Sequence, residues 1–379
     1  MTSQQPPAVV VGLNSITGLQ SARILARRGV PVFGVTGSLS HYTSRTNVCE
    51  RIVETDLNDE AALAETLVAL AETLGQKAVL VPCSDPTVLA IARHRARLEP
   101  LYHISLPELR TLELLMDKVR FYAYAQDCGL PVPRMFLLAS REDAERTAGE
   151  LAFPVILKPP FKTPRWEANT KIKAYKVPSR EAFLELYDRC SAWADELMVQ
   201  EYVEGPDANL YSCNGYFTGS GKPLVTFVAR KLRQWPPETG TSCLGEEVRN
   251  DEVLEETVKL FRALNYRGLG YVEMKRDKRT GKHYLIEPNA GRPTGRSAIA
   301  EAGGVELLYT MYCDAAGLPL PENRQQQYRG VKWIYLRWDF QSALHYWRRG
   351  ELSLREWWRS VRGPKGYAVF SLSDPAPFL

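Results

Sequence analysis

Three side chains with metal-binding oxygen atoms flank a predicted hairpin turn. Glu273 lies in one β-type run, Glu287 and Asn289 lie in the next, and a polar turn over residues 278–282 separates the runs. If the hairpin closes about Thr280, Glu273 faces Glu287, because each lies seven positions from the centre. Opposed carboxylates repel unless one is protonated or a cation lies between them, and such ligands suit Mg²⁺ carrying a nucleotide phosphate. The alternative is a solvated polar face with an accidental register.

Side-chain alternation predicts the two faces of this hairpin. Glu273, Glu287 and Asn289 share one face. The opposite face carries three apolar side chains that can be buried, namely Val272, Met274 and Ile286. The hairpin is therefore predicted to be amphipathic.

Composition indicates an ordinary globular chain. Its 379 residues suffice for two or three domains, and 45% are hydrophobic and 24% charged. The net charge of +4 is too small to argue for nucleic acid. No basic leader or long apolar run is visible, so a cytoplasmic location is expected. Seven scattered cysteines without C-x-x-C spacing favour reduced, mostly buried thiols, and five dispersed histidines disfavour a His-based metal site or a catalytic triad.

The first part of the chain alternates apolar strands with amphipathic helices. This alternation predicts a parallel, doubly wound α/β sheet in a domain that ends near residue 110. The predicted strands are 8–12, 30–35, 51–55 and 78–85, and the predicted helices are 19–29, 60–74 and 86–98.

The turn after the first strand does not match the dinucleotide fingerprint G-x-G-x-x-G. Asn14 and Thr17 hold the second and third glycine positions, and no acidic residue follows the second strand to hold a ribose. A nicotinamide cofactor is therefore disfavoured. The turn near Ser15 and the loop 82–85 still lie at the carboxyl ends of strands, where such sheets place ligands, so either is a candidate contact for a small substrate.

Two lysines precede the hairpin in positions that suit phosphate binding. Lys118 lies on a helix predicted to end at Gly129, and Lys158 ends the strand in FPVILKPP, just before a Pro-Pro break. A cation at a strand end can project toward a phosphate instead of into a core. The alternative for Lys118 is a solvated helix lysine. The run LMVQEYVEGPD then follows as a strand with an acidic and apolar exit.

In their order and spacing these segments resemble the ATP-grasp superfamily, of the carboxylate–amine ligase type, over about residues 8–310. The motifs that carry the resemblance are Asp117-Lys118, P-V-I-L-K ending at Lys158, Q-E-Y-V-E-G over 200–205, G-Y-V-E ending at Glu273, and L-I-E-P-N containing Glu287 and Asn289. The resemblance implies a mixed α/β and α+β architecture. Its expected parts are a Rossmann-like parallel pre-domain (1–110), a linking helix with a small lid lobe (111–203), a large α+β catalytic lobe (204–330) and a C-terminal extension (331–379).

The resemblance also implies cofactors and binding residues. ATP is expected with one or two Mg²⁺ ions, for which Mn²⁺ could substitute. Lys118 and Lys158 match phosphate-binding residues, and Asp207 matches the ribose-binding acid, with Asn209 as the alternative. The implied adenine contacts are Glu201, Tyr202 and Val203, largely through backbone groups, and the implied metal ligands are Glu273, Glu287 and Asn289.

The segment 160–175 departs from the family pattern. Family members usually cover the phosphates with a glycine-rich loop, and this segment has no glycine. Lysine can bind phosphate as a point charge, so Lys162, Lys171 and Lys173 are candidate replacements. A solvated basic loop is the alternative.

Arginines are the candidate catalytic groups. Arg230 and Arg233 end a strand after the linker, and Arg292 and Arg296 follow the metal motif beside a predicted helix over 297–302. Guanidinium groups near a helix start can clamp a carboxylate or phosphate. The resemblance implies a role for Arg230, Arg233 or Arg292 in stabilising the acyl phosphate or the charge that develops in the transition state.

The reaction that this resemblance implies is ATP-dependent C–N bond formation. A small carboxylate, with amino acids among the candidates, would become an acyl phosphate and then couple to an amine, releasing ADP and phosphate. A bicarbonate-activating carboxylase or carbamoyl-phosphate-type enzyme is the alternative. A Rossmann oxidoreductase and a non-catalytic ATP-binding scaffold are less favoured.

The C-terminal extension is rich in tryptophan and arginine. Five of the eight tryptophans lie in 331–379. WIYLRWDF (333–340) is predicted as a strand, and ALHYWRR and LREWWRSV as helices. Packing on the body or across a homodimer contact is favoured over peripheral membrane contact, and no nucleic-acid partner is expected.

Overall fold

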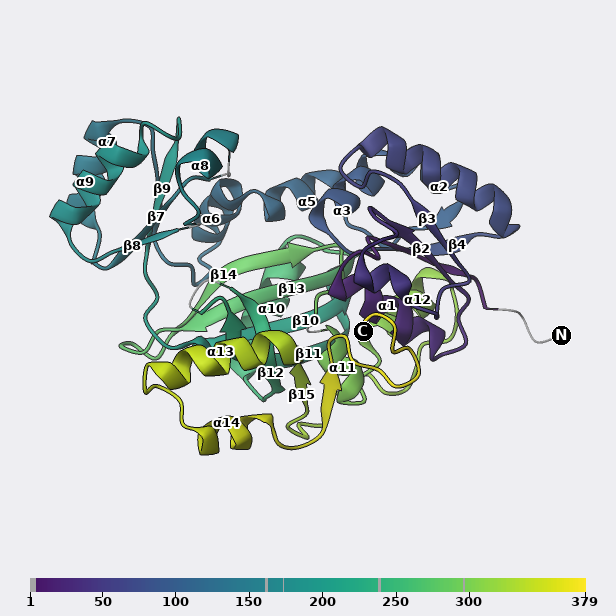
Figure 1. Cartoon of the computed structure of the whole chain (residues 1–379). Helices are drawn as coiled ribbons and strands as arrows, with labels where there is room; N and C mark the ends of the chain where they lie inside the picture. The colour runs from purple at the N-terminus through teal and green to yellow at the C-terminus, as the bar shows by residue number, and fades with distance from the viewer. Residues whose placement is uncertain (1–4, 161–162, 173, 238–239, 296) are drawn as a thin grey trace.

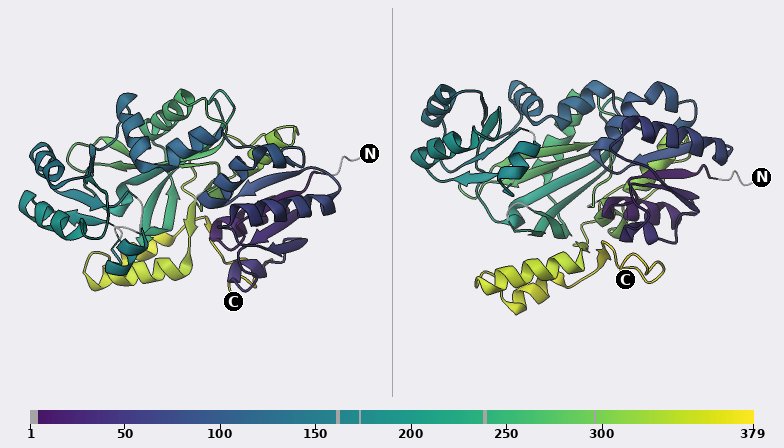
Figure 2. Two further views of the ribbon diagram at one scale, coloured as in Figure 1. Left: turned by 90° about the horizontal axis from the view of Figure 1, so that it is seen from above. Right: turned by 45° about the horizontal axis from the view of Figure 1, so that its top comes forward.

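The protein contains three β-sheets: one in the first domain, one in the lid lobe and one long central sheet (Figure 1). The computed structural model describes residues 5–160, 163–172, 174–237, 240–295 and 297–379. The sheets have the strand orders β3-β2-β1-β4-β5, β6-β9-β7-β8 and β14-β13-β10-β11-β12-β15-β16. The lid lobe and the first domain stand on opposite sides above the long central sheet (Figures 1 and 2). No helix within the described ranges is long and apolar enough to cross a membrane.

The first domain is the predicted doubly wound parallel sheet. Its strands are β1 (Ala8–Val11), β2 (Val32–Thr36), β3 (Arg51–Glu54), β4 (Ala78–Pro82) and β5 (Tyr102–His103). Its helices are α1 (Ile16–Ala26), η1 (Tyr42–Arg45), α2 (Glu60–Leu74), α3 (Asp85–Arg93) and α4 (Arg95–Leu98). The expectation for α2 is confirmed, since the Asp59 carboxylate caps its start and Gly75, at φ +67°, ends it. The single helix expected over 86–98 is wrong, because His94 leaves helical geometry and separates α3 from α4.

Two helices lead from the first domain to the lid lobe. The sequence predicted one helix here, and the structure has α5 (Leu109–Met116) and α6 (Lys118–Asp127). The chain is extended at Asp117, whose carboxylate accepts hydrogen bonds from the backbone N–H groups of Val119 and Arg120. This cap starts a new helix, and it makes Lys118 the first residue of α6 instead of a mid-helix residue.

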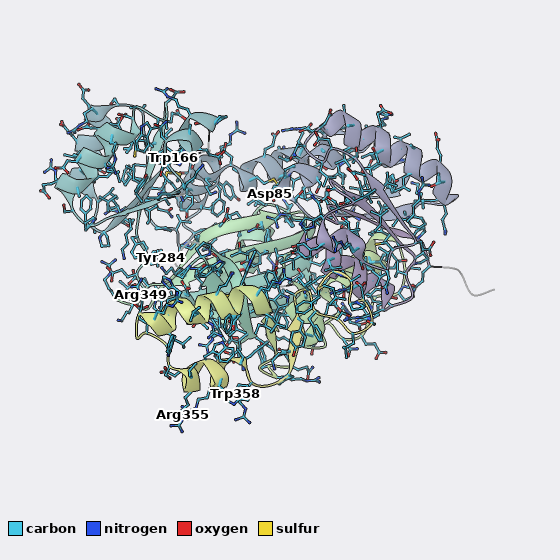
Figure 3. All side chains as sticks on the ribbon, viewed as in Figure 1. Asp85, Trp166, Tyr284, Arg349, Arg355 and Trp358 are labelled. Carbon is cyan, nitrogen blue, oxygen red and sulfur yellow. The ribbon has the colours of Figure 1, made fainter. Side chains whose placement is uncertain are left out.

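The lid lobe is a small antiparallel sheet with helices on one face. It contains β6 (Met135–Leu138), α7 (Arg141–Glu150), β7 (Val155–Lys158), α8 (Pro164–Asn169), β8 (Tyr175–Val177), α9 (Arg180–Cys190) and β9 (Leu197–Glu201). The glycine-free segment includes α8, which the Thr163 side chain caps. Trp166 of α8 is 1% exposed and packs in the lid core (Figure 3). An anchored helix therefore occupies much of the segment where the family has a glycine-rich loop.

The central sheet carries the predicted hairpin. It contains β10 (Leu210–Phe217), β11 (Pro223–Trp235), β12 (Thr241–Glu247), β13 (Gly268–Arg276), β14 (His283–Ala290), β15 (Lys332–Ile334) and β16 (Lys365–Tyr367). The associated helices are η2 (Asp207–Asn209), α10 (Asp251–Ala263), α11 (Ser297–Ala302), α12 (Leu307–Ala315), α13 (Leu336–Arg348) and α14 (Leu354–Val361). All pairs are antiparallel except β15 with β16. The C-terminal extension therefore completes the central sheet.

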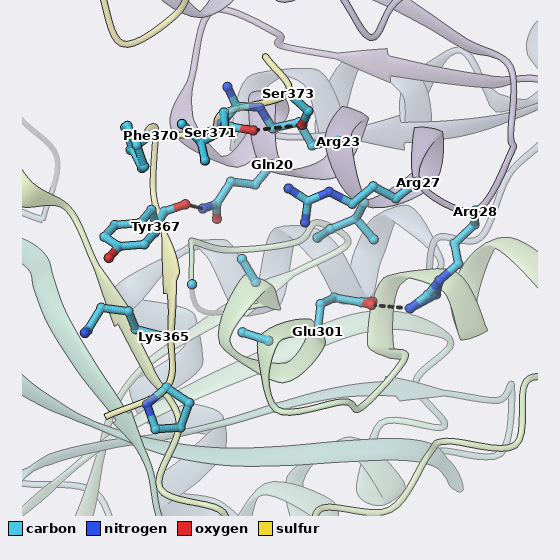
Figure 4. A pocket seen from close by; sticks show the side chains of 16 residues that line it. Gln20, Arg23, Arg27, Arg28, Glu301, Lys365, Tyr367, Phe370, Ser371 and Ser373 are labelled. Atoms are coloured by element: carbon cyan, nitrogen blue, oxygen red, sulfur yellow. Dashed lines mark hydrogen bonds and ion pairs between the residues drawn. The ribbon is translucent and has the colours of Figure 1, made fainter. Parts of the chain in front are cut away.

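The tail departs from its predicted strand and reaches back to the first domain. The strand expected over 333–340 stops at Ile334, and α13 begins at Leu336. Beyond β16, Asp374 accepts hydrogen bonds from Arg23 of α1 (2.8 Å) and from Thr46 (2.5 Å). Figure 4 shows this junction, where α1, α11 and the tail enclose a cavity of about 710 Å³ away from the Glu273–Glu287 pair.

The Arg23–Asp374 ion pair should contribute strongly to stability. Both side chains are almost fully buried, with 6% and 1% of their surface exposed. Asp374→Asn removes the charge that compensates Arg23, so we expect the free energy of unfolding to fall by about 3 kcal/mol in urea denaturation. Asp195→Asn is the matched control, since the Asp195 side chain is 98% exposed. A loss for Asp374→Asn as small as that of the control would contradict a stabilising role for this pair.

Candidate active site

Glu273 and Glu287 are directly opposed in the structure. The β13–β14 ladder pairs Glu273 with Glu287 and Tyr271 with Asn289, as the sequence predicted. Toward the turn, however, Met274 pairs with Leu285, which leaves Ile286 as an extra residue in a β-bulge. Leu285 is fully buried and Ile286 is only half-buried. The prediction that Ile286 shares the buried face with Val272 and Met274 is therefore wrong, because the register shifts by one residue at this point and Leu285 is buried there instead.

The bulge is what brings the two carboxylates together. Next to the turn, Arg276 pairs with His283, so the hairpin closes between Arg279 and Thr280. Continued without a bulge, that register would place Ile286 opposite Glu273. The extra residue moves Glu287 into that position. The opposed pair thus depends on a local irregularity that turn residues do not specify.

A lysine approaches each carboxylate. Lys118 Nζ lies 3.4 Å from Glu287 Oε1, and Lys231 Nζ lies 3.6 Å from Glu273 Oε2. Lys231 is buried in β11 and also donates to Gln234 (2.9 Å). Sequence reasoning missed Lys231. Alternation places it on the opposite face of the strand from its neighbour Arg230, and the sequence alone does not say which face meets Glu273.

A hydrogen-bonded chain links Lys158 of the lid lobe to the bulge. Lys158 Nζ donates to Gln200 Oε1 (3.4 Å), and Gln200 Nε2 donates to the Tyr122 hydroxyl (2.5 Å). That hydroxyl donates in turn to the carbonyl oxygen of Ile286 (2.9 Å). Lid sheet, helix α6 and hairpin are therefore coupled beside the carboxylates.

The charge state of Lys158 is set by its surroundings. Burial and, to a smaller extent, the nearby Lys118 ammonium lower the pKa of Lys158 to about 8, while Glu287 acts in the opposite direction. An anionic ligand stabilises the protonated form of such a buried lysine, because the ligand replaces the lost hydration and opposes the repulsion from Lys118. Lys118 and Lys158 thus converge on one place, as their predicted phosphate roles require.

The linker has groups that suit a planar heterocycle. The Glu201 carboxylate pairs with Arg134 (2.7 Å), so its side chain is already engaged. The Tyr202 ring lies under the Lys176 and Lys275 ammonium groups, 4.0 and 4.6 Å from its centroid. No described residue accepts a hydrogen bond from the backbone N–H of Val203, although Val203 is only 6% exposed. A buried free N–H is available to a ligand acceptor.

Asp207 is held by the C-terminal extension. One carboxylate oxygen accepts from Gln234 (2.6 Å), and the other accepts from Tyr346 of α13 (2.9 Å). Burial raises the pKa of Asp207, although hydrogen bonds from Tyr346 and Gln234 oppose that rise. Asn209, the alternative, donates to the carbonyl oxygen of Arg276 (3.0 Å). The position of Asp207 therefore depends on a helix outside the segment that resembles the family.

A cavity of about 360 Å³ lies beside the opposed carboxylates. Predicted residues in its wall are Glu273, Glu287, Asn289 and Arg292. Other side chains around it are Thr17, Lys231, Thr241, Ser242, Tyr271, Thr294 and Trp333. Arg292 donates to Asp85 and to Asn289 Oδ1, both at 2.5 Å. Thr17 in the first turn of α1 and Asp85 at the start of α3 lie at the two first-domain segments that were expected to contact a small substrate.

Among the described residues, three further predicted cations do not line this cavity, namely Arg230, Arg233 and Lys171. Arg230 pairs with Glu246 (2.9 Å), and the buried Arg233 pairs with Asp339 of α13 (2.7 Å). The geometry gives Arg233 a structural role, and Lys231 supplies the cation from β11 instead. Lys171 is exposed after α8 and donates only to a backbone carbonyl oxygen (3.5 Å). Three candidates lie outside the described residues, namely Lys162, Lys173 and Arg296.

The donor set fits a hard divalent cation. Two carboxylates and the Asn289 amide oxygen are oxygen ligands of the kind that Mg²⁺ takes, and phosphate and water usually complete its shell. The described residues contain no group of three or more His, Cys, Asp or Glu placed to hold a metal. In the structure, Lys118 and Lys231 compensate the two carboxylates.

Comparisons with known proteins identify relatives among amino-acid ligases. No family model matches the chain. The chain is 26% identical over 256 residues to a D-aspartate ligase of Enterococcus faecium (strain Aus0004), covering 62% of this chain and 58% of that protein. It is 25% identical over 207 residues to a D-alanine–D-alanine ligase of Pseudomonas entomophila (strain L48), covering 51% and 61%. The chain thus spans less than two thirds of the length of these curated relatives.

Solved structures support the fold. A biotin carboxylase–β,γ-ATP complex from Campylobacter jejuni matches with a TM-score of 0.66 at 16% identity, over 87% of this chain and 75% of that chain. A phosphoribosylglycinamide synthetase from Anaerococcus prevotii matches with a TM-score of 0.63 at 15% identity, over 83% and 76%. The predicted ATP-grasp architecture, with its parallel pre-domain, lid lobe and large α+β lobe, is therefore confirmed.

The electrostatic coupling of Lys158 can be measured without any ligand. Glu287→Gln removes the charge that supports protonated Lys158, so the pKa of Lys158 should fall below about 8. Lys118→Met removes the repelling cation, so the pKa should rise. NMR titration of the Lys158 Cε resonance would give both shifts, and Glu255→Gln, at an exposed position of α10, is the control. Equal pKa values in all four proteins would contradict the convergence of these groups.

Proposed function

We propose that this ATP-grasp protein is an ATP-dependent ligase that joins a small carboxylate to an amine. The carboxylate would first be phosphorylated to an acyl phosphate with release of ADP. The amine would then displace phosphate and form an amide. The observation that carries the proposal is the convergence of Lys118 and Lys158 on Glu287, whose carboxylate opposes Glu273 in the wall of one cavity.

The first step transfers a phosphoryl group. A carboxylate oxygen of the substrate forms a bond to the γ-phosphorus, and the bond from that phosphorus to the β–γ bridging oxygen breaks. Mg²⁺, when bound by Glu273, Glu287 and Asn289, would neutralise charge on the phosphate oxygens. Lys118 and Lys158 hold those oxygens in line, so the protein contributes mainly positioning and charge compensation. This step requires no covalent enzyme nucleophile.

The second step forms the C–N bond. The amine nitrogen attacks the acyl carbon, the bond from that carbon to the phosphate oxygen breaks, and the amine proton passes to solvent or phosphate. Arg292 and Lys231 line the cavity and are the candidate groups to stabilise the leaving phosphate. Asp85 orients the Arg292 guanidinium across the boundary between domains (2.5 Å). Arg292 thus keeps its predicted role, and Lys231 replaces Arg230 and Arg233.

Nucleotide binding would begin at the linker. The free backbone N–H of Val203 suits an adenine ring nitrogen, and Tyr202 borders the same segment. Asp207 is held in place by Gln234 and Tyr346 and is the candidate for the ribose hydroxyls. The Lys158–Gln200–Tyr122 chain then aligns the phosphates with the hairpin.

Amino acids are the best-supported substrate class. Two relatives with recognisable sequence similarity are named D-aspartate ligase and D-alanine–D-alanine ligase, and a cavity of about 360 Å³ suits small substrates. The carboxylase alternative has support only from the fold, through neighbours such as the biotin carboxylase. A homodimer and a cytoplasmic location stay predictions from sequence.

Loss of one metal ligand should abolish turnover. We expect Glu287→Gln to reduce Mg²⁺-dependent ADP release by at least about a hundredfold, because the developing phosphate charge loses its counter-ion. The assay is an ADP-release screen of purified protein over small amino acids, each with and without amine acceptors. Glu255→Gln is the matched carboxylate control and should keep wild-type turnover.

Two outcomes of this screen, and one result of a separate nucleotide-binding measurement, would contradict the proposal. Full turnover by Glu287→Gln would remove the metal assignment. ADP release that requires bicarbonate and no amine would favour the carboxylase alternative. NAD(P)H binding without ATP affinity would favour an oxidoreductase.

ATP affinity should fall as pH rises above about 8. The free protein holds Lys158 with a pKa of about 8, whereas bound phosphate favours its charged form, so affinity is full below that pH and decreases by up to about tenfold per unit above it. Calorimetry in two buffers near pH 8 should show uptake of about half a proton on binding. Lys158→Arg, which stays charged, should remove the uptake. Uptake that persists in this variant would assign the proton to another group.

A further inference from the structure

The helices α13 and α14 form a hairpin whose outer face is apolar and exposed. This outer face consists of Leu336, Phe340, Trp347, Leu354 and Trp358, which are 37%, 62%, 51%, 68% and 58% exposed. The hairpin projects below the central sheet (Figure 2, right). Figure 3 shows Trp358 and Arg355 at the outermost edge of the molecule. An exposed apolar cluster of this size indicates a contact surface.

Helical periodicity separates apolar groups from cations on this hairpin. In α14 the residues 354, 357, 358 and 361 share one side, and no residue of the helix is buried. Arg355, Arg359 and Arg362 recur at the same helical spacing along the flank of that side. In α13 the residues 336, 340, 343 and 347 form the apolar stripe, flanked by Arg337 and Arg348. The outer face therefore has an arginine rim.

Two apolar hollows lie within the outer face. One has a volume of about 490 Å³ between α13, α14 and β16, and the other has about 260 Å³ between the two helices. Phe340 and Trp357 border both hollows. The surface thus offers space for apolar chains as well as exposed rings.

Contacts on the inner side of the hairpin hold α13 and α14 against the central sheet. Asp339 accepts from Arg233 of β11 (2.8 Å) and from the Trp357 indole (3.0 Å), and Ser360 accepts from Arg233 (2.7 Å). Tyr346 on the same side donates to Asp207. These buried contacts anchor both helices, so the folded state does not require the outer face.

We propose that the outer face docks the protein on an anionic phospholipid surface. Interfacial helices bury an apolar stripe at the headgroup boundary, with tryptophan among the buried rings and arginine on the polar side. The hairpin has six exposed arginines, at 337, 348, 349, 355, 359 and 362, against exposed Glu351 and Glu356. Among the described residues only Arg349 of this set forms an ion pair, with Glu351. The excess positive charge complements anionic headgroups.

The same positive charge argues against a second copy of the chain as the partner that covers the outer face. Two outer faces brought together would oppose two arginine rims, and like charges resist association. An acidic protein partner shares the charge complementarity. The apolar hollows and the exposed rings on both helices of the hairpin favour a fluid surface, because acyl chains can fill irregular space that a rigid partner must match in shape.

Sedimentation with lipid vesicles tests the proposal on the full chain. The probe is a sucrose-loaded vesicle of equal parts phosphatidylcholine and phosphatidylglycerol, with pure phosphatidylcholine as the neutral reference. We expect binding to the anionic vesicles that weakens with salt, together with a blue shift of tryptophan emission. Leu354→Ser with Trp358→Ser should abolish the binding. Arg355→Gln with Arg359→Gln should weaken it about thirtyfold, at about fivefold per arginine.

Matched controls lie on the first domain. Leu39→Ser changes a side chain that is 50% exposed, and Arg51→Gln changes an exposed arginine, so both should bind like the wild type. Equal binding by the α14 variants and the wild type, or no anionic-vesicle binding at low salt, would overturn the proposal. Dimerisation in ultracentrifugation that is lost in Leu354→Ser with Trp358→Ser would instead assign the face to a second copy. ADP release without vesicles should be unchanged in these variants, which separates this test from the catalytic proposal.

Discussion

The opposition of two carboxylates across a β-hairpin is the constraint on which the site depends. At a cross-strand separation of about 5 Å and an effective dielectric constant of about 20, two full charges repel by about 3 kcal/mol before screening by water. The protein meets this cost with Lys118 from the linking helix and Lys231 from the central sheet, and Lys158 approaches from the lid. In such a site, a metal ion bound with a phosphate can replace the lysines as the partner of the two carboxylates.

The C-terminal extension belongs to this arrangement, although its sequence stands apart from the family motifs. Its strands complete the central sheet, and Tyr346 fixes Asp207 at the expected ribose position. Arg233, which resembled a catalytic group, is used to anchor α13 through Asp339. One side of the helical hairpin therefore supports the nucleotide site, while the other side remains exposed. Folding and surface recognition are separated onto opposite sides of the same helices.

The sequence predicted groups whose position follows from alternation and order along the chain. Glu273, Glu287 and Asn289 on one face of the hairpin and Lys158 at a strand end are of this kind, whereas Lys118 was expected inside a longer helix. It did not predict the bulge at Ile286, because a single extra residue depends on tertiary partners such as the Tyr122 hydroxyl. It missed Lys231 because the face that a strand turns toward the site is decided by sheet packing. It joined α5 to α6 because the amphipathic pattern continues through the Asp117 cap.

The most direct test of the central claim is a crystal structure of the protein with Mn²⁺ and ADP. We predict an anomalous peak between Glu273 and Glu287, with carboxylate oxygens about 2.2 Å from the ion and the lysine contacts moved to phosphate. The Glu273–Glu287 pair would then be the metal–nucleotide anchor. A bound nucleotide whose metal lies elsewhere, with both carboxylates still paired to Lys118 and Lys231, would contradict the account.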